Sequence, residues 1–375
     1  MKSLNVLVKP VSGGCDMRCG YCFYADERRL REKPAPFERM KPETLETLTE
    51  KILSKAEESC TFCFQGGEPT LAGLDFFCSA VELQKKYNVN GVKISNSIQT
   101  NGIHIDSVWA EFLSLNRFLT GLSLDGPKEL HDALRVDAGG KGTFSRVMKA
   151  AETLKKAGAE FNILCVVNGT NVRHPARVYE FFRKNGFSHL QFIPCLDGFD
   201  GKKQPYSLEP EQYGRFLNTI FDLWYRDCLA GGQIRIRQFD NYIAMLLGMP
   251  PDSCENCGGC RAYLTLESDG GCYPCDFYTI DGWRLGNINE NGVEEMLSGE
   301  TAKRFEALSR NFGQECLECP YRLLCRGGCR RRRENGEGEL KKDALCAAYR
   351  IFFEYAAGRL CTLADGIAAG GRRTR

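Results

Sequence analysis

Three cysteines near the start of the chain have the spacing of metal ligands. Cys15, Cys19 and Cys22 follow one another as Cys-x3-Cys-x2-Cys, directly after an apolar run and a Gly-Gly turn. Three thiolates in one short loop can hold three irons of a 4Fe–4S cube and leave the fourth iron without a protein ligand. An iron with an open position can chelate a small molecule and deliver an electron into it. A zinc loop is the alternative, but zinc needs a fourth Cys or His, and none lies close in the sequence.

With Tyr21 before its last cysteine, this loop resembles the signature of the radical S-adenosylmethionine (SAM) enzymes. The resemblance implies that the amino and carboxylate groups of SAM bind the open iron. An injected electron then cleaves SAM to methionine and a 5′-deoxyadenosyl radical, which abstracts an otherwise inert hydrogen from the substrate.

Cysteines cluster again in the last third of the chain. One part reads Cys260-x9-Gly270-x4-Cys275, after Cys254, and the other reads Cys316-x2-Cys319-x5-Cys325-x3-Cys329, before Cys346. The chain has 20 cysteines and no secretion signal, which favours metal ligation over disulfides. Spacing alone leaves both iron–sulfur and zinc sites open.

The order of these cysteines resembles the SPASM extension, which carries two auxiliary 4Fe–4S clusters. The resemblance implies Cys254, Cys260, Cys275 and Cys329 as ligands of the first auxiliary cluster and Cys316, Cys319, Cys325 and Cys346 as ligands of the second. With four thiolates each, neither cluster has an open iron, so we expect both to transfer electrons. Cys257 and Cys272 lie close enough in sequence to replace an assigned ligand; we interpret both as non-ligands.

The elements that must position these residues alternate along the chain. Apolar runs predict strands at Leu4–Val8, Thr61–Phe64, Val92–Ile98, Phe118–Leu124, Phe161–Val167 and Leu190–Ile193, and amphipathic stretches predict helices at Pro42–Ala56, Leu74–Tyr87, Ser107–Leu115, Phe144–Lys156 and Pro175–Asn185. This alternation is typical of an α/β fold with parallel strands, either a partial barrel or a flat doubly wound sheet. The resemblance favours a partial (β/α)6 TIM-like barrel followed by the cysteine-rich SPASM domain.

We divide the chain at its changes of composition. Residues 1–232 are expected to form the radical SAM barrel with a bridging helix at Pro210–Leu229, residues 233–361 the SPASM domain with a closing helix, and residues 362–375 a disordered tail.

Polar residues follow several predicted strands, where active-site loops of such barrels lie. The second strand is followed by Gly66-Gly67-Glu68-Pro69, and the resemblance implies that Gly66, Gly67 and Glu68 hold the SAM amino group. By the same resemblance, Tyr21, Ser123, Arg135 and Leu196 match positions that contact SAM.

Asp276 stands next to the ligand candidate Cys275 and could take up a proton while a cluster takes an electron. The segments 61–74, 121–127 and 273–278 resemble the anaerobic sulfatase-maturating enzymes, in which Asp276 matches the catalytic base. This resemblance implies oxidation of a Cys, or a Ser, in an unfolded sulfatase to Cα-formylglycine. The expected partners are a sulfatase or peptide with a Cys/Ser-x-Pro/Ala-x-Arg motif and a flavodoxin or ferredoxin as electron donor.

Two other classes of protein fit parts of the pattern. A SPASM maturase that forms thioethers, carbon–carbon crosslinks or epimers in a ribosomal peptide has the same clusters, although only about a dozen residues precede Cys15 to bind a leader peptide. A non-enzymatic electron carrier or zinc protein would not need a β/α scaffold of this size.

Charge and hydropathy exclude further classes. The formal net charge is +2, so no global field indicates nucleic acid or a membrane surface as partner. No apolar run approaches the roughly 18 residues that span a bilayer, and we expect a cytoplasmic protein. Arg330–Arg333 form a basic run that we interpret as a solvated face, with a docking patch for an acidic electron donor as the alternative.

Overall fold

The computed structural model describes residues 1–32, 38–334 and 342–373, with side chains to residue 369. Its contacts divide the chain into two compact units, and neither is continuous in sequence. Unit 1 comprises residues 1–124, 134–162 and 261–306, and unit 2 comprises residues 125–133, 163–260 and 307–375. The expected domain boundary at residues 232/233 stays a prediction.

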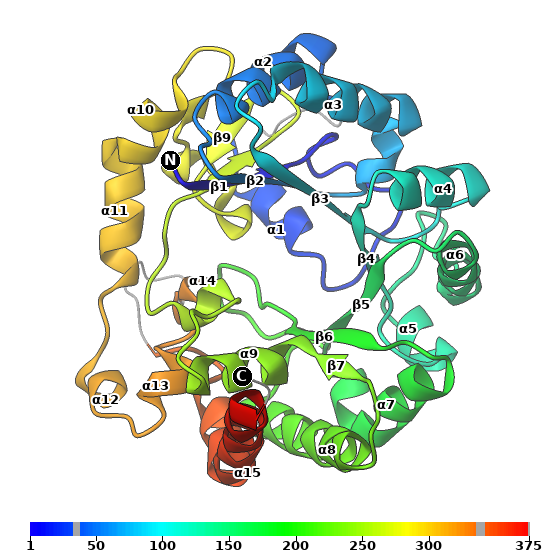
Figure 1. Cartoon of the computed structure of the whole chain (residues 1–375), viewed down its shortest axis with the longest axis vertical. Helices are drawn as coiled ribbons and strands as arrows, with labels where there is room; N and C mark the ends of the chain where they lie inside the picture. The colour runs from blue at the N-terminus through cyan, green and yellow to red at the C-terminus, as the bar shows by residue number, and fades with distance from the viewer. Residues whose placement is uncertain (33–37, 335–341, 374–375) are drawn as a thin grey trace. The chain divides into compact units, whose positions relative to one another are not determined.

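Unit 1 is built on a mostly parallel sheet (Figure 1). Its strands are β1 (Ser3–Val8), β2 (Ser59–Phe64), β3 (Lys93–Thr100), β4 (Leu119–Ser123), β8 (Leu264–Leu266), β9 (Gly271–Tyr273) and β10 (Gly286–Asn287). The order is β10-β9-β8-β1-β2-β3-β4, in which β8 to β4 are parallel and β9 and β10 are antiparallel to their neighbours. The cysteine-rich segment after residue 260 therefore extends the sheet that begins at the amino terminus.

The helices of unit 1 form where apolar residues recur at helical spacing. They are α1 (Phe23–Arg29), α2 (Pro42–Leu53), α3 (Leu74–Tyr87), α4 (Ser107–Leu115), α6 (Phe144–Lys156), α10 (Val293–Ser298) and most of α11 (Glu300–Ser309). Helices α2 and α3 pack against each other (Figure 1). The core contains a cluster of rings with edge-to-face contacts: Phe64, Phe76, Phe77, Trp109 and Phe118.

Unit 2 contains parallel strands β5 (Phe161–Val167, from residue 163), β6 (His189–Pro194) and β7 (Arg235–Ile236). Its helices are α5 (Lys128–Asp132), α7 (Pro175–Lys184), α8 (Pro210–Leu229), α9 (Arg237–Leu246), α12 (Gln314–Leu317), α13 (Arg322–Cys325), α14 (Arg330–Arg333) and α15 (Cys346–Arg373). Helix α15 packs on α8 and α9 through Phe221, Phe239 and Phe352 (Figure 1).

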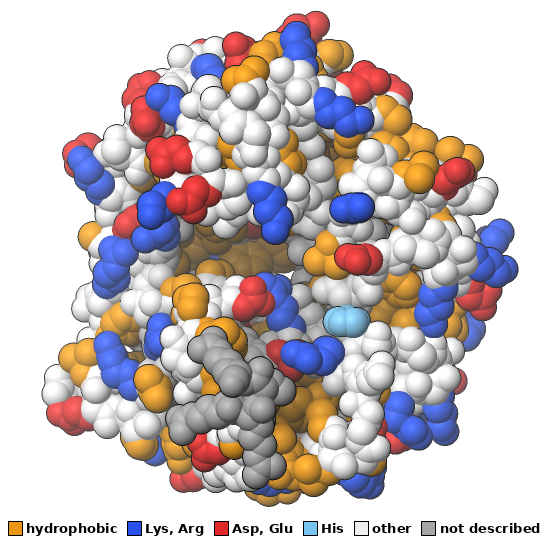
Figure 2. All heavy atoms as spheres, in the orientation of Figure 1, with side chains coloured by type: hydrophobic (Ala, Val, Ile, Leu, Met, Phe, Trp, Pro, Cys, Tyr) orange, Lys and Arg blue, Asp and Glu red, His pale blue; other side chains and the backbone are white. Residues whose placement is uncertain are grey.

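The predicted α/β class with a parallel sheet is confirmed, and most of the predicted elements end within two residues of the observed ones. Of the segment 362–375 that we expected to be disordered, residues 362–373 continue α15, with Ala364 buried, and residues 374–375 lie outside the described residues. Charged side chains of both signs are interspersed over the visible face, in keeping with the small net charge (Figure 2). No helix in the described parts of the chain is long and apolar enough to cross a membrane.

Candidate active site

The loop of Cys15, Cys19 and Cys22 lies in unit 1, between β1 and α1. Backbone hydrogen bonds tie it to the segment after Leu134: Arg18 N donates to Val136 O at 2.8 Å, and Gly20 N donates to Leu134 O at 2.9 Å. Burial raises the pKa of Cys15 and of Cys22. Three thiols held together in partly desolvated surroundings are the donors that an iron–sulfur cluster takes up as thiolates.

A second loop packs directly on the cysteine loop. Gly67 N donates to Ser12 O at 2.9 Å, and Glu68 N donates to Gly14 O at 2.8 Å. A Cβ on Gly67 would lie 2.0 Å from Gly14 O, so this approach requires glycine. The Gly-Gly pair thus sets the distance between the loops that follow β1 and β2.

Glu68 is fully buried, and its carboxylate joins the loops that follow β2 and β3. It accepts hydrogen bonds from Thr70 N (3.1 Å), Thr70 Oγ1 (2.6 Å), Thr100 Oγ1 (2.8 Å) and Asn101 N (2.7 Å). Burial raises the pKa of Glu68 against these four hydrogen bonds. In the structure the Glu68 side chain therefore connects two loops of the protein, and its binding of SAM stays a prediction.

The other predicted SAM residues have different surroundings. The guanidinium of Arg135 lies over the ring of Tyr21, 5.4 Å from its centroid, so the structure brings these two together in unit 1. Ser123 ends β4 in the same unit, and Leu196 follows β6 in unit 2. Asn101 Nδ2 donates to Asp16 Oδ1 at 2.8 Å, beside Cys15.

Asp276 lies in unit 1 at a short helical turn after β9, 5% exposed. Its Oδ2 accepts hydrogen bonds from Tyr24 Oη (2.7 Å) and Gln65 Nε2 (2.5 Å). Its Oδ1 lies 3.2 Å from Lys9 Nζ. A buried carboxylate so held has a fixed orientation, which a general base requires, and Lys9 compensates its charge.

Lys9 is the centre of a buried charge cluster, 1% exposed. Its Nζ donates to Thr279 Oγ1 at 3.0 Å and lies 3.7 Å from Glu27 Oε2 and 3.9 Å from Glu267 Oε1. Burial disfavours the charged amine, but the carboxylates of Asp276, Glu27 and Glu267 outweigh it and raise the pKa of Lys9. Burial raises the pKa of Glu27 to about 8, against the attraction of Lys9.

The strand ends explain why these groups meet. Val8 pairs with Phe64 and with Leu266, and the residues that follow these three are Lys9, Gln65 and Glu267. Tyr24 and Glu27 stand three residues apart on α1 and share one face of it. Our sequence reasoning missed Lys9, Tyr24, Glu27 and Gln65, although a polar residue directly after an apolar strand is a signal that would have found Lys9 and Gln65.

Among the described residues, the auxiliary ligand candidates form no disulfides. Cys254, Cys260 and Cys329 lie in unit 2, and Cys275 lies in unit 1 with Tyr263 Oη 3.9 Å from its sulfur. Burial, with the neighbouring thiol of Cys329, raises the pKa of Cys254 to about 12 and that of Cys260 to about 11.

Cys316, Cys319, Cys325 and Cys346 all lie in unit 2. Burial raises the pKa of Cys346, and the thiols of Cys316 and Cys319 raise it further, so the structure brings these three together. Cys257 is exposed and Cys272 is buried in β9. Among the described residues, no three His, Cys, Asp or Glu side chains converge as ligands of a single metal ion.

The fold is a parallel α/β sheet with a loop of three cysteines after its first strand, and two further groups of cysteines follow later in the chain. This combination defines a radical SAM enzyme with an iron–sulfur extension. The model of the Radical SAM superfamily matches residues 10–182, and that of the SPASM iron-sulfur cluster-binding domain matches residues 254–320. The chain is 46% identical over 373 residues to the cysteine-type anaerobic sulfatase-maturating enzyme of Clostridium perfringens, covering 98% of this chain and all of that one. It is 34% identical to the serine-type enzyme of Bacteroides thetaiotaomicron, over 95% and 90% of the two chains.

The fold of the chain is also similar to solved structures. Native anSMEcpe with bound AdoMet and Cp18Cys peptide matches with a TM-score of 0.92 and 46% identity, over 97% of this chain and 99% of that one. SuiB of Streptococcus suis bound to its precursor peptide SuiA shares the fold, with a TM-score of 0.62 and 18% identity over 92% and 76% of the chains. The chain belongs to the anaerobic sulfatase-maturating enzymes, which are radical SAM enzymes with a SPASM domain, and the predicted cofactors, 4Fe–4S clusters and SAM, are confirmed.

Proposed function

We propose that this enzyme oxidises a cysteine in an unfolded sulfatase segment, of the form Cys-x-Pro/Ala-x-Arg, to Cα-formylglycine. The observation that carries the proposal is the 46% identity over nearly the full length to cysteine-type relatives, against 34% and 30% to serine-type ones. We therefore expect cysteine to be preferred over serine.

In this proposal the thiols divide into three ligand sets. Cys15, Cys19 and Cys22 hold the cluster that binds SAM, with Tyr21, Gly66, Gly67, Glu68, Ser123, Arg135 and Leu196 around the cofactor. Cys254, Cys260, Cys275 and Cys329 hold the first auxiliary cluster, and Cys316, Cys319, Cys325 and Cys346 hold the second. When bound, SAM and its cluster supply the radical that removes a hydrogen from the substrate Cβ.

The proposed task of the protein's own residues is proton transfer. Asp276 Oδ1 or Oδ2 accepts the proton of the substrate thiol while Tyr24 and Gln65 fix the carboxylate and Lys9 balances its charge. Loss of the Cβ hydrogen to the radical, of the thiol proton to Asp276 and of one further electron, for which the auxiliary clusters would be the acceptors, leaves a thioaldehyde. Water converts the thioaldehyde to the aldehyde with release of hydrogen sulfide.

A flavodoxin or ferredoxin is the proposed electron donor. The Arg330–Arg333 run is not its docking site in this proposal, because Arg330, Arg331 and Arg333 are buried.

The test is mass spectrometry after anaerobic incubation of the cluster-loaded enzyme with SAM, a strong reductant and a peptide carrying Cys-x-Pro-x-Arg. We expect a hydrazine-trappable aldehyde at the cysteine, with one 5′-deoxyadenosine formed per product. Asp276→Asn should abolish the aldehyde, whereas Asp75→Asn, at a surface ion pair with Arg39, should leave it unchanged. Cleavage of SAM with an unchanged peptide would refute the sulfatase substrate and favour a crosslinking or epimerising maturase.

A further inference from the structure

The four arginines directly after Cys329 do not form the solvated face that their sequence suggested. They make up the short helix α14 in unit 2, and Arg330, Arg331 and Arg333 are 3–4% exposed. Arg330 pairs with Glu334, and Arg331 donates to Asp197 O and stacks on the ring of Phe199. Four buried guanidinium groups beside a ligand candidate are a costly arrangement, which indicates a specific electrostatic task.

Arg332 has the most direct connection to the proposed ligands. Its Nη2 lies 2.6 Å from Glu255 Oε2, and its Nε lies 3.0 Å from both carboxylate oxygens of Asp343. Its side chain is 8% exposed, and its guanidinium lies over the ring of Tyr349. A single cation thus pairs with two carboxylates, of which Asp343 is 3% and Glu255 is 20% exposed.

Both carboxylates belong to ligand loops. Glu255 is the neighbour of Cys254 in the chain. Asp343 Oδ2 accepts a hydrogen bond from Cys329 N at 3.1 Å, and Asp343 O accepts one from Cys346 N at 2.8 Å. Arg332 is thus connected to the ligand loops of the first auxiliary cluster through both carboxylates, and to Cys346 of the second through the backbone of Asp343.

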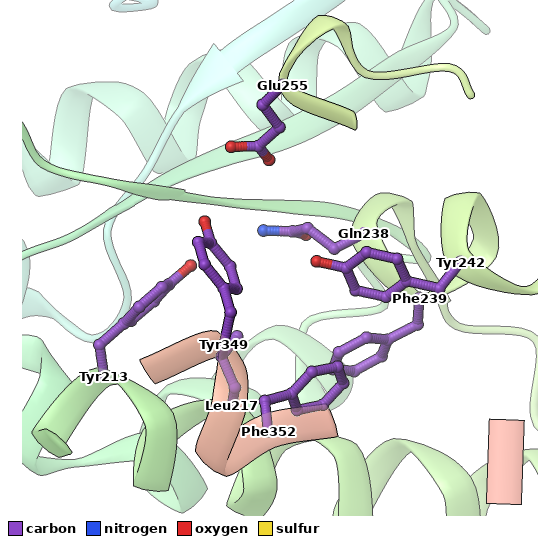
Figure 3. Close-up of a pocket in the computed structure, with 8 residues that line it drawn as sticks. All are labelled: Tyr213, Leu217, Gln238, Phe239, Tyr242, Glu255, Tyr349 and Phe352. Atoms are coloured by element: carbon purple, nitrogen blue, oxygen red, sulfur yellow. The ribbon is translucent and has the colours of Figure 1, made fainter. Parts of the chain in front are cut away.

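The surroundings leave little water to screen these charges. Glu255 faces a small pocket into which the hydroxyl groups of Tyr213, Tyr242 and Tyr349 point, above the rings of Phe239 and Phe352 (Figure 3). Tyr213, Tyr242 and Tyr349 are buried themselves. Beside these buried side chains, the charge of Arg332 is screened less than it would be in bulk water.

We propose that Arg332 is a positioning residue that sets the reduction potential of the auxiliary clusters, by holding Glu255 and Asp343 against their ligand loops and balancing the charge of both. This inference rests on the proposed ligand sets. A cation near a cluster stabilises the more negative, reduced state, so loss of Arg332 leaves two uncompensated carboxylates and should lower the potential.

The experiment uses the full chain with Cys15, Cys19 and Cys22 replaced by Ala, so that only auxiliary clusters assemble. Iron and sulfide analysis comes first, because two 4Fe–4S clusters in this parent test the ligand sets themselves. An EPR-monitored potentiometric titration then compares Arg332→Gln, Arg332→Lys and the control Arg359→Gln, which alters a partly exposed ion pair with Asp222 in the same unit.

We expect Arg332→Gln to lower the reduced-to-oxidised ratio at a fixed potential about tenfold, equal to about 59 mV for a one-electron couple. The reduction potentials of Arg332→Lys should lie nearer those of the parent, and those of Arg359→Gln should equal the parent values. Glu255→Gln removes a negative charge and should raise the reduction potential. This variant tests the proposal even if Arg332→Gln does not assemble its clusters. Unchanged potentials in loaded Arg332→Gln, or in Glu255→Gln, would overturn the proposal, whereas a parent without two clusters would refute the ligand sets instead.

Discussion

Replacing Lys9 by Met would remove the cation at the centre of the buried charge cluster of unit 1. Its Nζ lies 3.2 Å from Asp276 and 3.7 Å from Glu27. At an effective dielectric constant of about 20, the nearer pair alone amounts to an attraction of about 5 kcal/mol. The desolvation of Lys9 offsets part of this, and breaking a buried pair in proteins costs about 3–5 kcal/mol. We expect Lys9→Met to destabilise the folded enzyme by this amount at alkaline pH.

The loss should depend on pH because the carboxylates can take up protons instead. Burial raises the pKa of Glu27 to about 8 from its ordinary 4.5, so the folded state binds a proton more tightly than the unfolded state. The stability that this proton confers is fully present below pH 4.5 and is lost as the pH rises through about 8. Without Lys9 the charged form of Glu27 is opposed further, so the variant should be markedly less stable at pH 8.5 than at pH 6.

The assay is anaerobic calorimetry at one scan rate, at pH 6 and pH 8.5. We expect Lys9→Met to lower the apparent unfolding temperature by about 4–6 °C at pH 8.5 and by less at pH 6. Lys9→Met with Glu27→Gln should recover part of the loss, and Lys55→Met, at an exposed pair with Glu294, should change little. Equal losses at both pH values, or a double variant no better than the single one, would refute the reasoning.

Two further substitutions test the contact between the loops after β1 and β2 and the packing of α15. Gly67→Ala places a Cβ 2.0 Å from Gly14 O, so it should separate the two loops and lower the rate of 5′-deoxyadenosine formation at least tenfold. The control Gly282→Ala, with open space around it, should keep the parent rate, and equal rates for the two variants would contradict the close approach. Phe352→Ala removes a buried ring stacked on Phe239, with 5.4 Å between the ring centroids, and should lower the free energy of unfolding in denaturant by about 3–5 kcal/mol. Ile367→Ala, at an exposed position of the same helix, should lower it by about zero, and similar losses in both variants would contradict the packing.

Much of the fold could be predicted from the sequence because it depends on local periodicity. The alternation of apolar runs and amphipathic stretches placed α3, α4, α6, α8 and β5 at their observed bounds. Strands β7 to β10 have only two or three residues each, too few to show a period, and their pairing with distant strands forms them. Helix α15 extends past residue 361 because tertiary packing covers positions such as Ala364, which composition did not reveal.

For the site, the sequence by itself determined which soft donors the chain offers and how they are grouped, because residue type and short spacing are read directly from it. Only the tertiary structure decided the surroundings of Asp276, since Lys9, Tyr24, Gln65 and Asp276 come from four separate segments of the chain. It also decided that Arg332 is a buried cation and not a surface charge. Burial and charge pairing depend on which distant segments pack together, and local sequence carries no record of that.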